Sequence, residues 1–545
     1  MNDTPALEQA RDWLLFKDVL RAIDTWGTER WLTVYDRKES RLDSQLVFCA
    51  VIPDALVADA LRSSDWDLSV GDGAPGCTVS IDPDGQTVTY YRLGSADGVE
   101  PLVLCRRFCG LRPSALEISE EYRLFHELYY DEDRHVYVKL AMDGEEEDAI
   151  RVSEDHLDIS IRHVKQFLSV KGARLAVFIS ARRFSEFDLE ELGIAESRNE
   201  FRSSDRTHVV NVGEYDHTDP KTFSWLLGKK LIEGMPRSKS GYWPYDEEVT
   251  EYARFVIGYD AEGRPALHSC DHRSLSNYFG ANPGEPHYLT PVFFRREVLQ
   301  KYYASPAKYT VEDNAIYCRS LWSLRVDNNH EKYVVVYLGD LGRDLSCREQ
   351  SYWKSFNVPP DGSISEVEFR RAFLGEFTDP SRADLVFKLK FDLFNRDWLD
   401  RFGWELIRPL IEKDRHFLAA LRIPLTTDQA EFDSQVLALA KVVVDSLNDS
   451  ALESEPPAKT PGAKSIDKLK AFLQAKGLVG FEHHIQFLRD LFALRSTGSA
   501  HRKGRSYEKA GGPFGIASKP LPEAFEDILL QAIALLDYLR ENLLT

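Results

Sequence analysis

The sequence predicts an α+β protein, in which a large mixed N-terminal region with hairpins and helices precedes an all-α C-terminal bundle. Three observations predict this class. Apolar runs of strand length recur between turn residues through the first 350 residues, apolar positions three to four residues apart dominate from about residue 361, and four amphipathic patterns fill the last 120 or so residues. Sequential hairpins mixed with helices favour α+β over a doubly wound sheet.

Short apolar runs predict the strands of a first α+β domain, residues 1–200. Residues 77–81 and 87–91 flank Asp-Pro-Asp-Gly at 82–85, whose residue types favour a hairpin turn. The period changes in residues 153–171, where apolar residues from Leu157 to Leu168 recur at helical spacing, so we expect a helix there. Further strands are expected at residues 45–52, 135–140 and 173–180.

A second α+β domain is expected over residues 201–360. Hairpins are predicted at 255–268, around the turn residues 260–263, and at 324–338, around 327–330. Residues 291–303 are expected to be helical. Residues 361–425 then form a helical connector, with helices predicted at 366–373 and 414–422.

Four helices are predicted in the last domain, residues 426–545. Their apolar faces begin at Phe432, Ile466, Ile485 and Phe525 and recur every three or four residues. Residues 448–465 contain three prolines and a glycine among polar residues, so we expect a flexible loop there. Four amphipathic helices in so short a span are typical of a compact bundle.

The composition excludes several classes of protein. The 545 residues are 43% hydrophobic, and the net charge of −20 argues against a general nucleic-acid coat protein or a membrane-surface protein. The N-terminus has no apolar signal-peptide core, and no apolar run is long enough to span a bilayer, so we expect a cytoplasmic protein with no membrane partner. The sequence also lacks a Walker A loop, a Rossmann fingerprint and a serine-hydrolase elbow.

The motif Arg495-Ser-Thr-Gly-Ser-Ala-His501 stands out for its context rather than for its spacing. Arg495 ends an amphipathic helix in an all-helical domain, and Gly498 allows the chain to turn so that the arginine and the histidine face one cleft. On one straight helix the two side chains would point apart. The spacing by itself is common, because this chain repeats it at Arg151 and His156, at Arg202 and His208, and at Arg325 and His330.

The residues around the motif carry a net positive charge, whereas the chain as a whole is negative. Between residues 495 and 520 there are six lysines and arginines and a single carboxylate, that of Glu508. Such a local positive excess in an acidic protein is what the capture of a phosphate requires.

The segment Leu488-Arg-Asp-Leu-Phe-Ala-Leu-Arg-Ser-Thr-Gly-Ser-Ala-His-Arg-Lys-Gly504 resembles the catalytic segment of HEPN domains (higher eukaryotes and prokaryotes nucleotide-binding). That family has short helical bundles with an Arg-x4–6-His motif. Many members are metal-independent endoribonucleases of toxin–antitoxin, anti-phage and CRISPR effector systems, and they usually pair two motifs across a dimer. The resemblance covers the last 120 or so residues, and Ser496 stands where the family often has Asn or Asp.

The resemblance implies an RNA substrate and a catalytic set of Arg495, His501 and Ser496. An imidazole titrates near neutral pH, as acid–base catalysis requires, and a guanidinium presents a fork of donors to phosphoryl oxygens. Ser496 would orient the histidine or donate to a phosphate oxygen. No metal and no cofactor is required, and we expect a homodimer through the bundle and a regulatory or antitoxin protein partner. The cations expected to bind the RNA are Arg502, Lys503, Arg505 and Lys509.

Two alternatives stay open. The bundle could be a non-catalytic HEPN-like module for dimerisation or for binding a nucleotide or a partner. The N-terminal 425 residues, which resemble no family of known function, could also hold an enzyme. Within them, His268, Cys270 and His272 would share one face of a strand and suit zinc, although no fourth ligand is evident.

Overall fold

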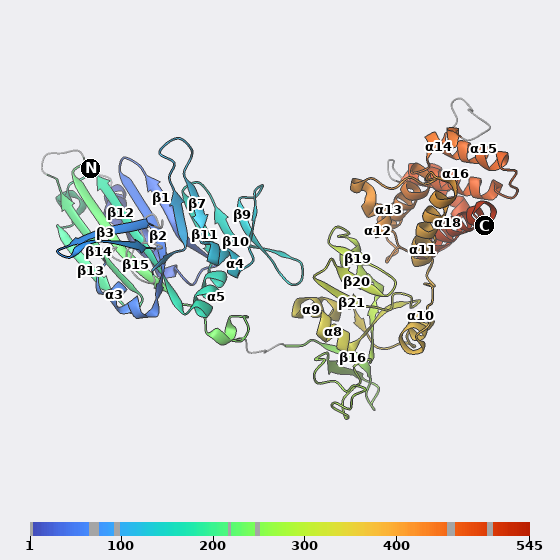
Figure 1. The fold of residues 1–545 in the computed structure, drawn as a ribbon, viewed down its shortest axis with the longest axis horizontal. Helices are drawn as coiled ribbons and strands as arrows, with labels where there is room; N and C mark the ends of the chain where they lie inside the picture. Colours follow the sequence, from blue (N-terminus) through green and yellow to red (C-terminus); the bar gives the residue numbers. More distant parts are fainter. Residues whose placement is uncertain are drawn as a thin grey trace. The chain divides into compact units, whose positions relative to one another are not determined.

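The structure is a computed structural model that describes residues 4–64, 76–91, 99–215, 220–245, 251–454, 464–498 and 505–544. The chain forms two compact units, drawn from blue to green and from yellow-green to red in Figure 1. Unit 1 comprises Met1–Ala141 and Glu145–Val249, and unit 2 comprises Met142–Gly144 and Thr250–Thr545. A large sheet in the N-terminal region and a helical C-terminal region make this an α+β fold, as predicted.

An eleven-stranded antiparallel sheet organises the described part of unit 1, in the order β13-β14-β15-β12-β2-β1-β11-β10-β9-β8, with β5 paired to β2. Its strands are β1 (Trp31–Glu39), β2 (Asp43–Pro53), β5 (Glu100–Pro101), β8 (Tyr129–Asp131), β9 (Val136–Leu140), β10 (Glu146–Val152), β11 (His156–Ser160), β12 (Ala173–Ser185), β13 (Ser197–Arg202), β14 (Arg206–Glu214) and β15 (Thr222–Ile232). The expected domain boundary at residue 200 lies within β13, and the sheet continues to the end of β15.

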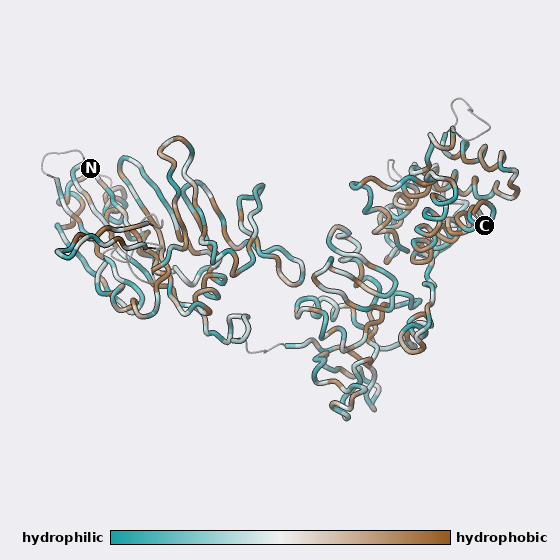
Figure 2. The backbone as a smooth tube through the Cα atoms, viewed as in Figure 1, coloured by the Kyte–Doolittle hydropathy of each residue, from teal (hydrophilic) through white to brown (hydrophobic). Residues whose placement is uncertain are grey.

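The central strand β12 carries a hydrophobic core on each face of this sheet. Leu175, Val177 and Ile179 belong to a large core that includes α5 (Ile161–Lys171), whereas Ala176 and Phe178 belong to a smaller core on the opposite face. Alternate residues of a strand point to opposite faces, so a continuous apolar run buries both. Figure 2 shows these hydrophobic stretches along the strands.

Short elements complete unit 1, and the hairpin predicted around residues 82–85 is confirmed as β3 and β4. The helix predicted over residues 153–171 is correct only from Ile161, because residues 156–160 form β11 and their apolar side chains alternate into the sheet. The short elements are α1 (Thr4–Leu14), α2 (Lys17–Thr25), α3 (Val57–Arg62), α4 (Glu120–Phe125), α6 (Leu189–Leu192), β3 (Gly76–Asp82), β4 (Gly85–Tyr91), β6 (Val103–Arg106) and β7 (Ala115–Ile118).

The first half of unit 2 has small sheets around an aromatic core that includes Phe294, Tyr302 and Trp353. The sheets have the strand orders β16-β17, β22-β18-β23 and β19-β20-β21, so β18 and β20 are the central strands of the two larger sheets. The elements are β16 (Arg254–Tyr259), β17 (Pro265–Ser269), β18 (Pro291–Arg295), α7 (Gln300–Tyr303), β19 (Tyr309–Val311), β20 (Ala315–Cys318), β21 (Trp322–Arg325), β22 (Tyr333–Tyr337), α8 (Leu338–Asp344), α9 (Cys347–Lys354), β23 (Asn357–Val358), α10 (Glu366–Phe369) and the π-helix η4 (Arg370–Leu374).

One expectation for this half was wrong and another was only partly right. Residues 291–303 are not one helix: β18 pairs with β22 and β23, and α7 begins only at Gln300. In the segment 324–338 the pairing of the predicted hairpin is reduced to one antiparallel bridge between Asp327 and Val335, because β21 pairs with β20 while β22 pairs with β18. The Asp327 carboxylate also accepts hydrogen bonds from the N–H and the hydroxyl of Ser365, at 2.7 Å each.

The second half of unit 2 is helical. Phe387, Phe394 and Trp398 of α11 share one core with Leu488 of α16 and Phe525 of α18, so the expected connector packs into the bundle. Helix α14 occupies part of the expected loop, of which residues 455–463 lie outside the described ranges. The helices are α11 (Ala383–Phe402), α12 (Arg415–Ala420), α13 (Gln429–Ala440), the π-helix η6 (Lys441–Asp445), α14 (Asp449–Ser454), α15 (Ser465–Ala475), α16 (Glu482–Gly498), α17 (Arg505–Gly511) and α18 (Leu521–Leu543). No described helix combines the length and the apolarity needed to cross a bilayer.

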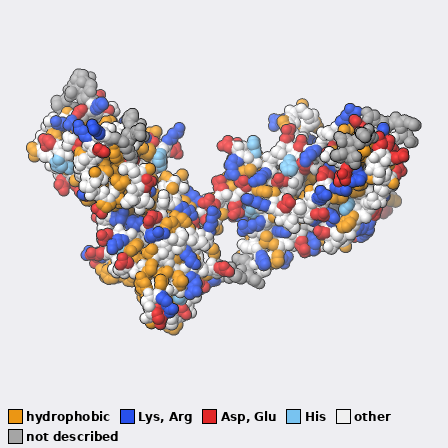
Figure 3. Space-filling model, turned by 180° about the vertical axis from the view of Figure 1, so that it is seen from behind, with side chains coloured by type: hydrophobic (Ala, Val, Ile, Leu, Met, Phe, Trp, Pro, Cys, Tyr) orange, Lys and Arg blue, Asp and Glu red, His pale blue; other side chains and the backbone are white. Residues whose placement is uncertain are grey.

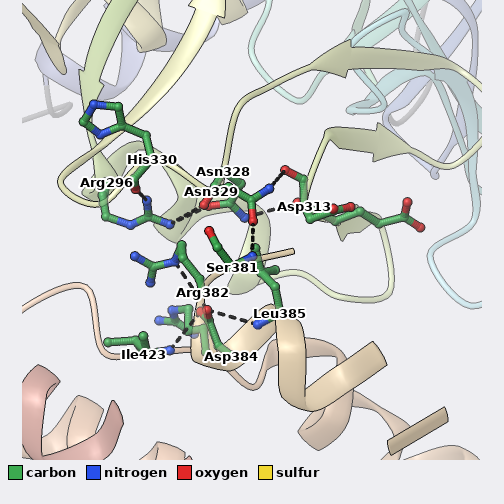
Figure 4. Close-up of polar contacts among 12 residues, drawn as sticks. Arg296, Asp313, Asn328, Asn329, His330, Ser381, Arg382, Asp384, Leu385 and Ile423 are labelled. Carbon is green, nitrogen blue, oxygen red and sulfur yellow. Dashed lines mark hydrogen bonds and ion pairs between the residues drawn. The ribbon is translucent and has the colours of Figure 1, made fainter. Parts of the chain in front are cut away.

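Polar contacts join the two halves of unit 2 (Figure 4). The side-chain oxygen of Asn329 accepts a hydrogen bond from the Ser381 N–H at 2.9 Å. Asp384, at the start of α11, forms an ion pair with Arg382 at 3.3 Å and accepts from the Ile423 N–H at 3.1 Å. Because the Asp384 side chain is only 5% exposed, these contacts are a buried anchor for the first turn of α11.

Candidate functional site

Helix α16 positions the predicted arginine. Its residues Ile485, Leu488, Leu491 and Leu494 are buried in the bundle core at intervals of three or four, the spacing of one helical face. Arg495 comes directly after this face, and its side chain is 25% exposed. The helix continues to Gly498, so the predicted turn comes no earlier than that glycine.

An ion pair orients the Arg495 side chain. Its Nη2 donates to the Asp445 carboxylate at 2.8 Å, and the Asp445 side chain is 33% exposed. Asp445 ends η6, a π-helical turn that continues α13, and such turns are frequent at functional sites. The guanidinium also lies over the ring of Phe492, 5.9 Å from its centroid. The arginine is therefore held at the bundle surface by contacts from two elements.

The hydroxyl groups that follow Arg495 are bonded to their own helix. The Ser496 hydroxyl donates to the Phe492 carbonyl at 2.8 Å, and the Thr497 hydroxyl donates to the carbonyls of Ala493 and Leu494 at 3.0 Å. Back-bonding of this kind satisfies helix carbonyls. In this geometry the Ser496 hydroxyl donates its hydrogen bond to the backbone of α16.

A hydrogen-bonded group from α13 and α17 lies at the end of α16. The Tyr507 hydroxyl and the Gln429 amide donate to the same carboxylate oxygen of Asp433, at 2.8 and 3.0 Å. A Cβ on Gly498 would lie 3.4 Å from atoms of both Asp433 and Tyr507, so the backbone of Gly498 packs against this group. Burial and then Asp433 raise the pKa of Tyr507, so its hydroxyl stays protonated and continues to donate.

Sequence patterns did not indicate these partners of the motif. Asp445, Asp433 and Tyr507 come from separate elements, and nothing local connects them to Arg495. The one available signal was the spacing of Gln429 and Asp433, four residues apart on a predicted helix.

Some predicted site residues fall beyond what the structure describes. His501, Arg502 and Lys503 lie outside the described residues. Arg505 and Lys509 are exposed on α17, and α17 places them beside the Tyr507 that binds Asp433. Over the face seen in Figure 3, positive and negative side chains are interspersed rather than gathered into fields of one sign.

The zinc alternative finds no support at His268, Cys270 and His272. The His268 imidazole lies 2.9 Å from the Glu285 carboxylate, and the buried Cys270 thiol donates to Gln350 at 3.3 Å. Across the part of the chain that the structure describes, no group of three or more His, Cys, Asp or Glu side chains is arranged to hold a metal ion.

Comparison with protein-family models, with curated proteins and with solved structures found no match for this chain. The described geometry itself offers an oriented guanidinium at the surface of a helical bundle, and in the sequence His501 follows this Arg495 with five residues between them. A fixed cation stabilises charge that develops on a phosphate, and an imidazole moves protons near neutral pH.

Proposed function

We propose that the C-terminal helical domain is a metal-independent endoribonuclease of the HEPN type, in which Arg495 and His501 cleave RNA. The observation that carries this proposal is the oriented guanidinium of Arg495 beside the segment that holds His501. Asp433 lies near both flanks of that segment: it accepts a hydrogen bond from Tyr507, and a Cβ on Gly498 would come within 3.4 Å of its carboxylate.

Chain connectivity supports a meeting of the two catalytic groups. Three residues lead from Gly498 to His501, so their Cα atoms lie at most about 11 Å apart. Arg495 precedes Gly498 by three helical residues, a rise of about 4.5 Å. The long arginine side chain and the imidazole are therefore able to reach one phosphate.

The proposed reaction uses only the RNA, the protein and water. His501 removes the proton of the ribose 2′-hydroxyl, the 2′-oxygen attacks the adjacent phosphorus, and the bond from phosphorus to the 5′-oxygen breaks. The leaving 5′-oxygen takes up a proton from water, from the imidazolium of His501, or from the same histidine of a second copy of the chain. The products are a 2′,3′-cyclic phosphate and a 5′-hydroxyl. Arg495 stabilises the charge on the phosphorane oxygens, a contribution of about 3–4 kcal/mol for one well-placed donor.

RNA binding would come from the cations that follow the motif. Arg505 and Lys509 are exposed on α17 beside Tyr507, and Arg502 and Lys503 precede them in the chain. Each phosphate contact of this kind makes binding weaken as salt rises. The high negative charge of the rest of the chain would confine RNA to this region.

We further propose that two copies pair through the bundle, so that two motifs form one site. Phe492, three residues before Arg495 on α16, is a large apolar side chain with 38% of its surface exposed. An interface over this ring would place two Arg495 side chains near a common axis, and interfaces favour such aromatic anchors. Light scattering that reports a monomer at micromolar concentration would contradict the pairing.

A regulated toxin or anti-phage effector is the biological role that the HEPN resemblance supports. RNA cleavage without control would harm the cell, so the proposal includes restraint by unit 1 or by a separate regulatory or antitoxin protein. The expected place of action is the cytoplasm. Arrest of growth on overexpression, absent for Arg495→Ala, is the expected sign of this role.

A second function, non-catalytic dimerisation or binding of a nucleotide or partner, is favoured by one observation. The Ser496 hydroxyl is bonded to the Phe492 carbonyl, and the Arg495 charge is already matched by Asp445. Tight RNA binding without product over hours is the result that distinguishes this function from a nuclease.

The nuclease proposal is tested by the ends of the products. Purified full-length protein is incubated in EDTA with an RNA cut at a mapped position, and with the same RNA carrying a 2′-deoxy nucleotide there. We expect a 2′,3′-cyclic phosphate from the first RNA and no cleavage at that position of the second. Equal cleavage of both RNAs would exclude attack by the 2′-hydroxyl.

A further inference from the structure

A large cavity lies where the two halves of unit 2 meet. Its volume is about 1140 Å³, slightly above the usual range of roughly 300–1,000 Å³ for small-molecule sites. Residues of the α+β half, among them Tyr303 and Glu312, line one side. Residues of α11, among them Lys388 and Asp392, line the other side together with Val442 of η6. A ligand in this cavity would touch both halves at once.

The charges in the cavity favour a positively charged ligand. Six Asp or Glu residues and four Lys or Arg residues line it, which leaves two negative charges in excess. Neither the Glu312 nor the Asp392 carboxylate forms a hydrogen bond or an ion pair with any residue that the structure describes. The Lys388 ammonium donates to the Ala419 carbonyl at 3.0 Å instead of contacting either carboxylate.

The surrounding protein covers these groups only in part, because Glu312 and Asp392 remain exposed to solvent. Desolvation raises the pKa of Glu312 and of Asp392, and it lowers the pKa of Lys388 to about 8. The Lys388 charge lowers the pKa of both carboxylates without contacting them, so a bound cation would add the direct contact that Lys388 does not make. Hydrogen bonds between ionised groups are stronger than neutral ones.

The same cavity offers the exposed ring of Phe377 to the body of a ligand. Tyr303 and Phe391 are buried in its wall, and Phe377 is a fully exposed ring that also lines it. The Tyr303 ring already has the guanidinium of Arg422 at 4.7 Å from its centroid. Rings in the lining of a cavity are typical of sites for flat organic molecules.

We propose that this cavity binds an organic cation with a flat aromatic body, held by the carboxylates of Glu312 and Asp392, and that the bound cation regulates the motif around Arg495 through η6. Val442 lines the cavity and Asp445, three residues further along the same π-helical turn, holds Arg495. The regulatory part rests on the proposed nuclease function, whereas the binding part does not.

Three indole probes of different charge test the binding part by calorimetry on the full chain at neutral pH. Tryptamine carries an ammonium, tryptophol is neutral and indole-3-acetate is an anion. We expect tryptamine to bind at least about tenfold more tightly than tryptophol, and indole-3-acetate to bind most weakly. Tightest binding of indole-3-acetate, equal binding of all three probes, or no binding of tryptamine at millimolar concentration would overturn the proposal.

Variants assign the site of tryptamine. Glu312→Gln and Asp392→Asn should each weaken the binding of tryptamine by about tenfold. Asp400→Asn, which changes an exposed carboxylate on α11 outside the cavity, should leave the affinity for tryptamine unchanged. Because Glu312 and Asp392 are themselves exposed, both variants should melt within a few degrees of the wild type, which shows that they fold. Full tryptamine affinity in both carboxamide variants would overturn the assignment.

The regulatory part has a separate readout. Saturating tryptamine changes the rate of RNA cleavage about fivefold in the wild type and does not change it in the double variant Glu312→Gln/Asp392→Asn. Tryptamine binding with no RNA cleavage by any sample would contradict the nuclease and leave the binding site standing. Binding with an unchanged cleavage rate would overturn the regulation, and cleavage without tryptamine binding would overturn the binding site.

Discussion

The guanidinium of Arg495 donates to the carboxylate of Asp445 at 2.8 Å, across 50 residues of sequence. One partner lies near the end of α16 and the other at the end of the π-helical turn η6. Both side chains are partly exposed, at 25% and 33%, so the pair orients the arginine without burying it. A catalytic cation needs this combination of fixed direction and access to substrate.

Neutralising Asp445 should weaken cleavage less than removing Arg495. In Asp445→Asn the guanidinium keeps its charge and loses its orientation, so we expect a cleavage rate reduced by about tenfold. The matched control is Asp467→Asn on α15. It breaks an exposed ion pair, at 2.6 Å, with Arg489, which lies on α16 as Arg495 does. Equal rates in Asp445→Asn and the wild type would show that Asp445 does not position the arginine.

The buried anchor at Asp384 should matter to the stability of unit 2. The Arg382 side chain is only 12% exposed, and Asp384→Ala removes the carboxylate that pairs with it. The same variant leaves the Ile423 N–H without its acceptor. We expect the free energy of unfolding in urea to fall by about 3–5 kcal/mol. The exposed Asp400→Asn should change it by less than about 0.5 kcal/mol. A loss below about 1 kcal/mol for Asp384→Ala would contradict this role.

His156 in unit 1 should stabilise the fold only on the acidic side of its pKa. Its Nδ1 lies 2.8 Å from Asp36 and its Nε2 lies 3.2 Å from Asp158, and these contacts, led by that with Asp158, raise its pKa to about 9. The contribution is therefore complete below about pH 6.5 and lost as pH rises through about 9.

Measurements of unfolding free energy for the wild type and His156→Gln test this from pH 6 to pH 10. Because 43% of the side chain is exposed and solvent screens the pair, we expect a difference of at most about 1 kcal/mol at pH 6. The difference should vanish near pH 10. A difference that grows with pH would refute the assignment.

Two buried histidines of unit 1 should have the opposite dependence on pH. Burial lowers the pKa of His126 to about 3 and that of His163 to about 4, and the His126 ring bonds to the His163 carbonyl at 2.9 Å. The unfolded chain binds protons below about pH 6.5 and the folded chain does not, so stability falls as pH drops from there toward 4. Histidine proton NMR should show neither ring titrating above pH 5. Titration of either ring near pH 6.5 would contradict its neutral state.

Local periodicity predicted the strands whose apolar residues are contiguous and the helices whose faces are amphipathic. It identified β12 and the hairpin of β3 and β4, whose turn residues are local signals. It was wrong for residues 291–303, because the pairing of β18 with β22 and β23 is a long-range contact. It was only partly right for the hairpin around 327–330, where a single bridge joins Asp327 to Val335 while β21 and β22 pair with other strands.

The candidate site shows the same division between local and long-range information. Arg495 at the surface of a bundle helix followed from helical spacing and motif context. Its partner Asp445, and the Asp433–Tyr507 contact at the flanks of the His501 segment, depend on how α13 packs against α16 and α17. The cavity between the halves of unit 2 depends on tertiary packing throughout, so no stretch of sequence indicates it.

The central claim is that one guanidinium and one imidazole of the helical domain cut RNA. The measurement that tests it most directly is the single-turnover cleavage rate in EDTA of the wild type, Arg495→Ala and His501→Ala, with Arg489→Ala as the control on α16. We expect both motif variants to lose at least about a hundredfold in rate while the control keeps the wild-type rate. Cleavage by either motif variant at the wild-type rate would contradict it.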